Sequence, residues 1–126
     1  MTYQALHGHF LEDLQVGMSE SFAKTVTGAD IVGFANVSGD TNPVHLDEAF
    51  AAASPFKGRI AHGMLGASLL STVFGTKLPG PGCIYVSQDV RYKAPVRIGD
   101  TVVAKVTIVE IMAEKRRVKF ACECRV

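Results

Sequence analysis

The last third of the chain alternates apolar and polar residues with a period of two. This alternation is typical of β-strands that have one covered face, and it predicts strands over residues 84–93, 102–109 and 118–126. Ala113 and Glu114 form a tight connection between the last two runs, which should therefore pair as an antiparallel hairpin. A further short strand is predicted over residues 21–26.

An uncharged apolar stretch occupies residues 64–74 and is long enough for three helical turns. Its apolar side chains surround most of a helical circumference, which predicts a buried helix that Gly75 and Pro79 end. Two shorter helices precede it. Thr27 can cap a helix over residues 29–37, and Asp47 can start one over Glu48–Ala53. The turn formers of residues 38–43 separate these two helices.

A buried helix and an antiparallel sheet that can curl around it define an α+β fold. The order of strand, short helices, buried helix and strands is that of the hotdog fold. The 126 residues suit one domain, residues 1–126, which can bury a core without metal or disulfide cross-links.

The composition, with 48% hydrophobic and 20% charged residues, is ordinary for a soluble globular protein. A net charge of +1 gives no overall field that would attract nucleic acid or an anionic membrane. The sequence shows neither a signal peptide nor an apolar run of bilayer length, and its three cysteines suggest no disulfide framework. These features predict a reduced, cytoplasmic protein, with Cys122 and Cys124 buried and unpaired in the core.

The polar residues Asp40 and His45 flank a proline turn ahead of the apolar helix. A carboxylate and an imidazole at this spacing can converge to bind and deprotonate a water molecule. The spacing alone is a weak pattern and favours a structural turn residue and a hydrogen-bonded loop histidine. Gly63 could present its N–H to an oxyanion at the helix start, or could simply form a tight turn there. His62 could act as a base, although burial against the helix start is favoured.

The sequence lacks several motifs of other enzyme classes. It contains no G-x-S-x-G elbow of serine hydrolases, no Walker A sequence and no dinucleotide-binding glycine pattern. Ser68 and Ser71 in the apolar helix could bond to their own helix carbonyls.

Four segments together resemble the MaoC-like (R)-specific enoyl-CoA hydratases. They are residues 38–47 (SGDTNPVHLD), 58–64 (GRIAHGM), 90–96 (VRYKAPV) and the pair Gly99-Asp100. The resemblance extends over roughly residues 10–126 and is strongest between residues 37 and 75. The combined motif is far more specific than any of its parts.

This resemblance implies a hotdog homodimer in which the acyl chain of a CoA thioester lies in a tunnel beside the central helix. It implies that Asp40 and His45 activate water, that Asn42 helps to shape the site, and that Gly63 offers its N–H to the thioester oxygen. It also implies that Ser71 lines the site near the aspartate. Water would add to a 2-enoyl-CoA to give the (R)-3-hydroxyacyl product, with no metal and no redox cofactor.

Members of this family normally have one more strand after the last predicted here. The sequence therefore leads us to expect a domain in which this strand is missing from the sheet. Two other functions remain open. A hotdog thioesterase often carries a catalytic acid on its central helix, and residues 64–74 contain none. A non-catalytic acyl-CoA binding module would be expected to lack Asp40 or His45.

Two further expectations concern the substrate. Arg91, Lys93 and Arg97 are candidates to bind the phosphates of coenzyme A, although solvated surface charges would show the same pattern. Phe74 lies three residues after Ser71 and would fill the depth of the tunnel, which favours short acyl chains. The alternative is that Phe74 packs against the sheet, away from the tunnel.

Overall fold

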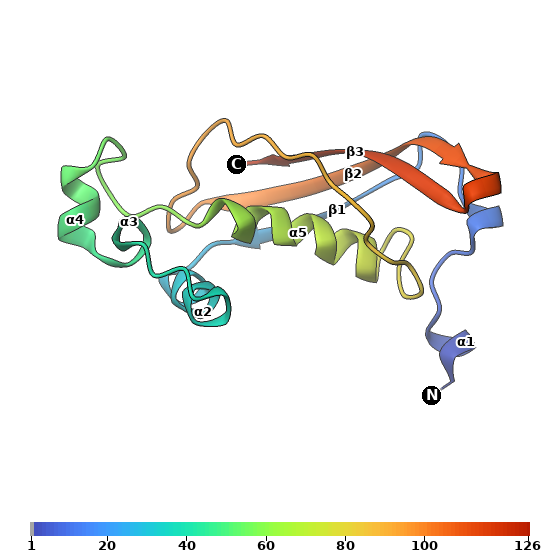
Figure 1. The fold of residues 1–126 in the computed structure, drawn as a ribbon, viewed down its shortest axis with the longest axis horizontal. Coiled ribbons are helices and arrows are strands. Elements are labelled where there is room, and N and C mark those ends of the chain that lie inside the picture. Colours follow the sequence, from blue (N-terminus) through green and yellow to red (C-terminus); the bar gives the residue numbers. More distant parts are fainter. Residues whose placement is uncertain (1) are drawn as a thin grey trace. The chain divides into compact units, whose positions relative to one another are not determined.

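The computed structural model describes residues 2–126 and shows an α+β hotdog fold (Figure 1). In chain order its elements are α1 (Tyr3–Leu6), η1 (Leu11–Asp13), β1 (Ser19–Thr25), α2 (Gly28–Ser38), α3 (Pro43–Leu46), α4 (Glu48–Ala53), α5 (Gly63–Thr76), β2 (Thr101–Met112), η2 (Ala113–Lys115) and β3 (Arg117–Arg125). The predicted central helix is α5, and the predicted short helices are α2 and α4. None of the helices formed by residues 2–126 has the length and apolar character needed to cross a bilayer.

The sheet has the strand order β1-β2-β3, and β2 and β3 form the predicted antiparallel hairpin. Val106 lies opposite Cys122 and Ile111 lies opposite Val118 in this hairpin. Arg116 makes the turn possible by adopting a left-handed conformation with φ of 53°. The hairpin is drawn in orange and red in Figure 1, with η2 at its tip.

The chain divides into two compact units. The first contains the described residues up to Phe22 together with Leu69–Gln88 and Val103–Arg125. Its buried side chains come from the second half of α5, from β2 and from two loops: Leu14, Leu69, Leu70, Val73, Leu78, Ala104, Val106 and Ile108. Burial alternates along β2 as the sequence pattern predicts, because one face of the strand points into this core.

The second unit contains Ala23–Ser68 and Asp89–Val102, together with Val126. Its core includes Val26, Ile31, Ala35, Ala61 and Leu65. A single antiparallel bridge joins Ile60 to Arg97, and the Ala61 amide donates to the Val96 carbonyl over 2.7 Å. These bonds connect the segment before α5 to the loop before β2.

Helix α2 ends close to Asp40, so its boundaries matter for the polar loop. Its N-terminus is a capping box in which Thr27 Oγ1 accepts from Asp30 N, and Thr27 N donates to the Asp30 carboxylate over 2.9 Å. The hydrogen bond from the Thr27 backbone N–H lowers the pKa of the Asp30 carboxyl group below its usual value, and the hydrogen bond from the Lys24 side chain contributes next. Gly39 terminates the helix with φ of 78°, a conformation that side-chain-bearing residues rarely adopt.

Helix α5 is less fully buried than the sequence predicts. Leu65, Leu69, Leu70 and Val73 are buried, but one face of the helix is exposed. The exposed positions recur every three or four residues and carry small, polar or flexible side chains: Met64, Ser68, Ser71 and Gly75. This exposed face could not be predicted, because it carries no charged residue, and serine or glycine can occur at buried and at exposed positions.

The prediction of a strand over residues 84–93 is wrong for the part of the chain that the structure describes. Within residues 2–126 the sheet contains β1, β2 and β3, and residues 84–93 form no ladder with them. The side chains of Ile84 and Val86 are 85% and 64% exposed. Alternation indicates which face of a strand is apolar, but a strand also needs a neighbour for its N–H and C=O groups.

The prediction that Cys122 and Cys124 are buried is also wrong, because both are exposed. Neither forms a disulfide within residues 2–126, as predicted. Both lie in β3, which is at the end of the strand order, and exposure increases along this strand after Phe120. The alternating pattern placed them correctly on one face but could not show whether anything covers that face.

Candidate active site

A series of short hydrogen bonds holds the loop from α2 to α3 in one conformation. Ser38 Oγ donates to the Phe34 carbonyl over 2.7 Å and accepts from Asp40 N over 3.1 Å. Asp40 Oδ1 accepts from Asn42 N over 3.2 Å, and Asn42 Oδ1 accepts from Val44 N over 3.1 Å. The last bond caps α3, the single helical turn that sequence reasoning treated as a loop. The orientations of Asp40 and Asn42 therefore follow from local turn chemistry.

The side chain of His45 is fixed by the segment that precedes α5. Its Nδ1 lies 2.8 Å from the Ile60 carbonyl oxygen, and its ring is 8% exposed. Arg59 Nε donates to the His45 carbonyl over 2.6 Å, and Ile60 N donates to the Val44 carbonyl over 3.3 Å. A carbonyl oxygen can only accept, so Nδ1 carries a hydrogen, and in the neutral ring Nε2 has the lone pair.

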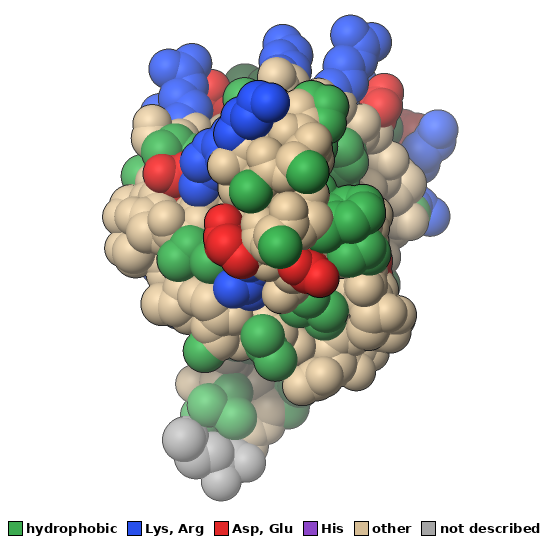
Figure 2. Space-filling view, turned by 90° about the vertical axis from the view of Figure 1, so that its left-hand side faces the viewer, with side chains coloured by type: hydrophobic (Ala, Val, Ile, Leu, Met, Phe, Trp, Pro, Cys, Tyr) green, Lys and Arg blue, Asp and Glu red, His purple; other side chains and the backbone are tan. Residues whose placement is uncertain are grey.

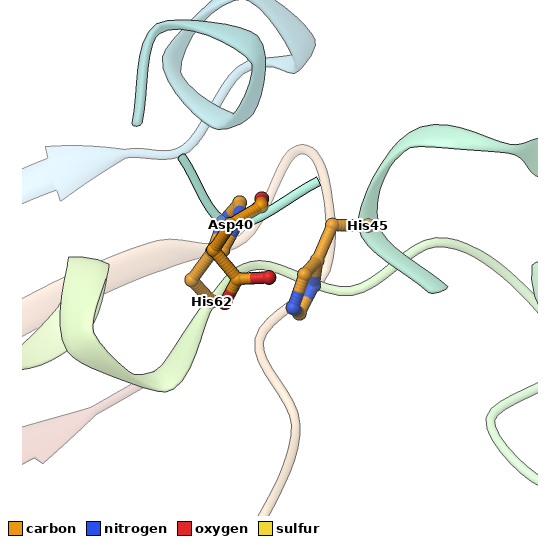
Figure 3. A group of neighbouring side chains, drawn as sticks. All are labelled: Asp40, His45 and His62. Atoms are coloured by element: carbon orange, nitrogen blue, oxygen red, sulfur yellow. The ribbon is translucent and has the colours of Figure 1, made fainter. Parts of the chain in front are cut away.

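His62 joins Asp40 and His45 in one cluster (Figure 3). Its Nε2 lies 2.9 Å from the Asp40 carbonyl oxygen, and its ring stacks on that of His45 with centroids 3.8 Å apart and planes 28° apart. One polar atom of each side chain lies within 4.8 Å of the others. Figure 3 shows the Asp40 carboxylate directed toward the His45 ring.

The cluster contains the residue types that bind transition metals, but its geometry does not favour a metal ion. A metal binds an imidazole along the nitrogen lone pair, in the plane of the ring. The His45 and His62 rings are stacked with a small angle between their planes, so their lone pairs do not converge on one point. The Nδ1 of His45 and the Nε2 of His62 are in addition hydrogen-bonded to carbonyl oxygens.

The histidines lie inside the protein while the carboxylate reaches solvent. His45 and His62 are 8% and 3% exposed, whereas Asp40 is exposed. Among the described side chains on the face drawn in Figure 2, no histidine is visible. Water can therefore approach the pair from the side of Asp40.

Gly63 begins α5, where the N–H groups have no acceptor within the helix. A Cβ atom on Gly63 would lie 2.8 Å from Cε1 of Tyr92, which is closer than real Cβ contacts. The Tyr92 hydroxyl donates to Met64 Sδ over 3.1 Å and so holds the ring over the helix start. Sequence reasoning included Tyr92 only within a family motif, and nothing in its spacing indicates this contact.

The remaining predicted residues lie as follows. Ser71 and Phe74 belong to the first unit, where Ser71 is exposed and the half-buried Phe74 ring contacts Tyr85 and Phe120, at centroid distances of 5.3 and 4.8 Å. Phe74 thus contacts strand β3, and its place relative to the acyl chain stays a prediction. The three cations that the sequence suggests for coenzyme A belong to the second unit, and each of them is exposed: Arg91, Lys93 and Arg97.

The chain belongs to the family described as MaoC like domain, which matches residues 13–123. The resemblance found in the sequence is thereby confirmed.

Three relatives illustrate the similarity. The chain is 52% identical over 117 residues to a 3-hydroxybutyryl-CoA dehydratase of Methylorubrum extorquens, covering 93% of this chain and 74% of the relative. It is 53% identical over 118 residues to an (R)-specific enoyl-CoA hydratase of Rhodospirillum rubrum, covering 94% and 82%. A solved (R)-hydratase from A. caviae, involved in PHA biosynthesis, superposes with a TM-score of 0.87 at 40% identity, covering 90% and 86%.

The contact between Gly63 and Tyr92 predicts how two glycines of the same helix respond to alanine. Nothing lies within 4 Å of a Cβ atom on Gly66, so Gly66→Ala should raise the free energy of unfolding by about 1 kcal/mol through helix propensity. Gly63→Ala should show no such gain, because the Tyr92 ring must move. Urea unfolding of both variants measures the difference.

Tyr92→Ala provides the control, since it removes the ring that a Cβ atom on Gly63 meets. In the Tyr92→Ala background, Gly63→Ala should no longer give a lower free energy of unfolding than Gly66→Ala. If Gly63→Ala and Gly66→Ala stabilise the protein equally while Tyr92 is present, the close contact between Gly63 and the Tyr92 ring is refuted.

Proposed function

We propose that the chain is an (R)-specific enoyl-CoA hydratase, a hydro-lyase that adds water reversibly to a trans-2-enoyl-CoA. The observation that supports this function best is the juxtaposition of Asp40 with a His45 whose Nε2 lone pair is free. Relatives at 52% and 53% identity are named for this reaction or its reverse.

The hydrogen bonds of His45 determine its part in the reaction. Because Nδ1 donates its hydrogen to the Ile60 carbonyl oxygen, Nε2 of the neutral ring is the atom that can accept a proton from water. The exposed Asp40 carboxylate accepts the second water hydrogen and orients the oxygen lone pair toward the substrate. The two groups act on one water molecule and belong to one loop.

The bond changes balance without any other reagent. The water oxygen bonds to the β-carbon while one O–H bond breaks, and the π electrons of the double bond move toward the thioester carbonyl. The Asp40–His45 pair delivers the proton taken from water to the α-carbon. Addition of both atoms by one pair of groups on one face gives syn addition, and the (R) configuration of the 3-hydroxyacyl product is the one that the name of the relative from Rhodospirillum rubrum supports.

Gly63 contributes to the same step through its main chain. Negative charge develops on the thioester oxygen as the β-carbon accepts water, and an N–H group at a helix N-terminus stabilises such charge. Gly63 is exposed at the start of α5, so its N–H can be approached. Asn42 supports the site indirectly by capping α3, which carries His45.

Several parts of the sequence prediction remain proposals. Arg91, Lys93 and Arg97 are exposed cations suited to the phosphates of coenzyme A. The expectation of no metal and no redox cofactor also remains a prediction; it rests on the addition of water changing no net oxidation state, and coenzyme A is counted as part of the substrate. A homodimer, a cytoplasmic location and a single domain over residues 1–126 remain predictions of the sequence.

Hydration of crotonyl-CoA tests the function. We expect loss of the conjugated thioester absorbance and formation of (R)-3-hydroxybutyryl-CoA, identified by chiral chromatography. Asp40→Asn and His45→Gln should each lower kcat/KM by about 10²- to 10⁴-fold, and the double variant should lose little more, because the two groups handle one proton.

Matched controls are available elsewhere in the chain. Asp47→Asn retains an N-cap residue on α4, and His9→Gln replaces an exposed histidine, so neither should change the rate substantially. Release of the free thiol of coenzyme A without hydration would instead identify a thioesterase. Binding without turnover would identify a binding module.

The acyl-chain preference is a separate proposal and rests on Phe74. Its ring forms a cluster with Tyr85 and Phe120, next to the exposed helical position Ser71. Three aromatic rings leave little depth for a long acyl tail beside this part of α5, and forcing extra methylenes into a filled space costs about 1–3 kcal/mol.

Crotonyl-CoA should therefore be a better substrate than octenoyl-CoA, and Phe74→Ala should shift the preference toward octenoyl-CoA. The kcat/KM values of both substrates for parent and variant measure this shift. Phe50→Ala, which removes an exposed ring outside the cluster, should leave the profile unchanged. Identical profiles for the parent and Phe74→Ala, or a parent that prefers octenoyl-CoA, contradict the proposal.

A further inference from the structure

His62 is the most unusual polar residue of the second unit. Its side chain is 3% exposed, and among the described residues Nδ1 has no hydrogen-bond partner. Buried polar atoms normally have partners, so such an exception calls for a physical reason. The ring contacts Phe34 at a centroid distance of 4.9 Å and His45 at 3.8 Å.

The hydrogen bond of His62 assigns its proton. Nε2 faces the Asp40 carbonyl oxygen at 2.9 Å, and a carbonyl cannot donate, so Nε2 carries the hydrogen. A second proton on Nδ1 would be a buried donor without an acceptor. Its Nε2 therefore holds the Asp40 carbonyl, and this hydrogen bond leaves Nε2 unable to serve as the base of the reaction.

His62 contacts both members of the Asp40–His45 pair through different interactions. It bonds to the main chain of Asp40 and stacks on the ring of His45. These two residues lie on opposite sides of the loop that contains Asn42 and Pro43. The local hydrogen bonds of this loop given by Asn42 N, Val44 N and His45 N span two or three residues, and none of these three joins Asp40 to His45 directly. His62, from the start of α5, is a single rigid group that touches both ends.

We propose that His62 is a positioning residue that sets the separation and relative orientation of Asp40 and His45, by its hydrogen bond to the Asp40 carbonyl and by stacking on His45. This inference rests on the proposed hydratase function. It also links the pair to Gly63, because His62 and Gly63 are neighbours in the chain. The water-activating pair and the Gly63 N–H are thus positioned by the same short segment, which contains His62.

Substitution of His62 tests the proposal through the division between kcat and KM. His62→Leu removes both the donor and the aromatic ring, and we expect kcat for crotonyl-CoA to fall about 100-fold, as for a small misplacement of reacting groups. KM should stay within about threefold, since His62 does not bind substrate. His62→Gln retains an N–H donor at a position like Nε2, and should recover at least about tenfold of the lost kcat.

A double variant distinguishes positioning from general damage to the fold. In an Asp40→Asn, His45→Gln background there is no functional pair left to position, so adding His62→Leu should lower the residual rate less than about threefold. Phe34→Leu is the matched control, because it alters packing on the same ring but leaves the bond to Asp40 in place. Its kcat should remain within about threefold of the parent.

The outcomes separate clearly. If the parent hydrates crotonyl-CoA but His62→Leu retains its kcat, or loses the same factor in the double-variant background, the positioning role is overturned. Equal rates for His62→Gln and His62→Leu would overturn the role of the hydrogen bond. If the parent itself does not hydrate crotonyl-CoA, the proposed function fails instead.

Discussion

The hydrogen bond between His45 Nδ1 and the Ile60 carbonyl is the constraint on which the site depends. It joins α3 to the segment before α5, and it places the only proton of a neutral His45 on the inner nitrogen. Arg59 and Ile60 reinforce this junction through main-chain bonds to His45 and Val44. The chemistry of the site thus follows from a contact between His45 and Ile60, which are 15 residues apart in the chain.

The fold supports this junction from both sides. Gly39 ends α2 in a left-handed conformation and directs the chain into the polar loop. The bridge between Ile60 and Arg97 and the bond from Ala61 to Val96 hold the other segment in place. Burial of His45 and His62 then protects the junction from competing water, while Asp40 remains accessible.

Much of this architecture could be predicted from the sequence. The alternation in residues 102–109 and 118–126 predicted β2 and β3, and the capping pattern at Thr27 predicted α2. The failures share one physical cause, which is that local patterns carry no information about partners. Residues 84–93 alternate like a strand but lack a ladder neighbour in the described chain, and Cys122 lies on an apolar face that remains exposed.

The lack of information about contact partners also limited what could be predicted of the site. Asp40, His45 and Gly63 could be selected because their residue types suggest water activation and oxyanion binding, and the family motif joined them. The stacking of His62 on His45 and the approach of Tyr92 to Gly63 could not be found, since both depend on side-chain packing between distant segments. The adjacency of His62 to Gly63 was the only available signal.

The tautomer of His45 is the most direct test of this account. In protein labelled with ¹⁵N-histidine, long-range ¹H–¹⁵N spectra at alkaline pH distinguish a protonated from an unprotonated ring nitrogen, and His45→Gln assigns the signals. The account predicts a protonated Nδ1 and an unprotonated Nε2. A proton on Nε2 with Nδ1 unprotonated would contradict it, because the base facing the water would then have no lone pair to use.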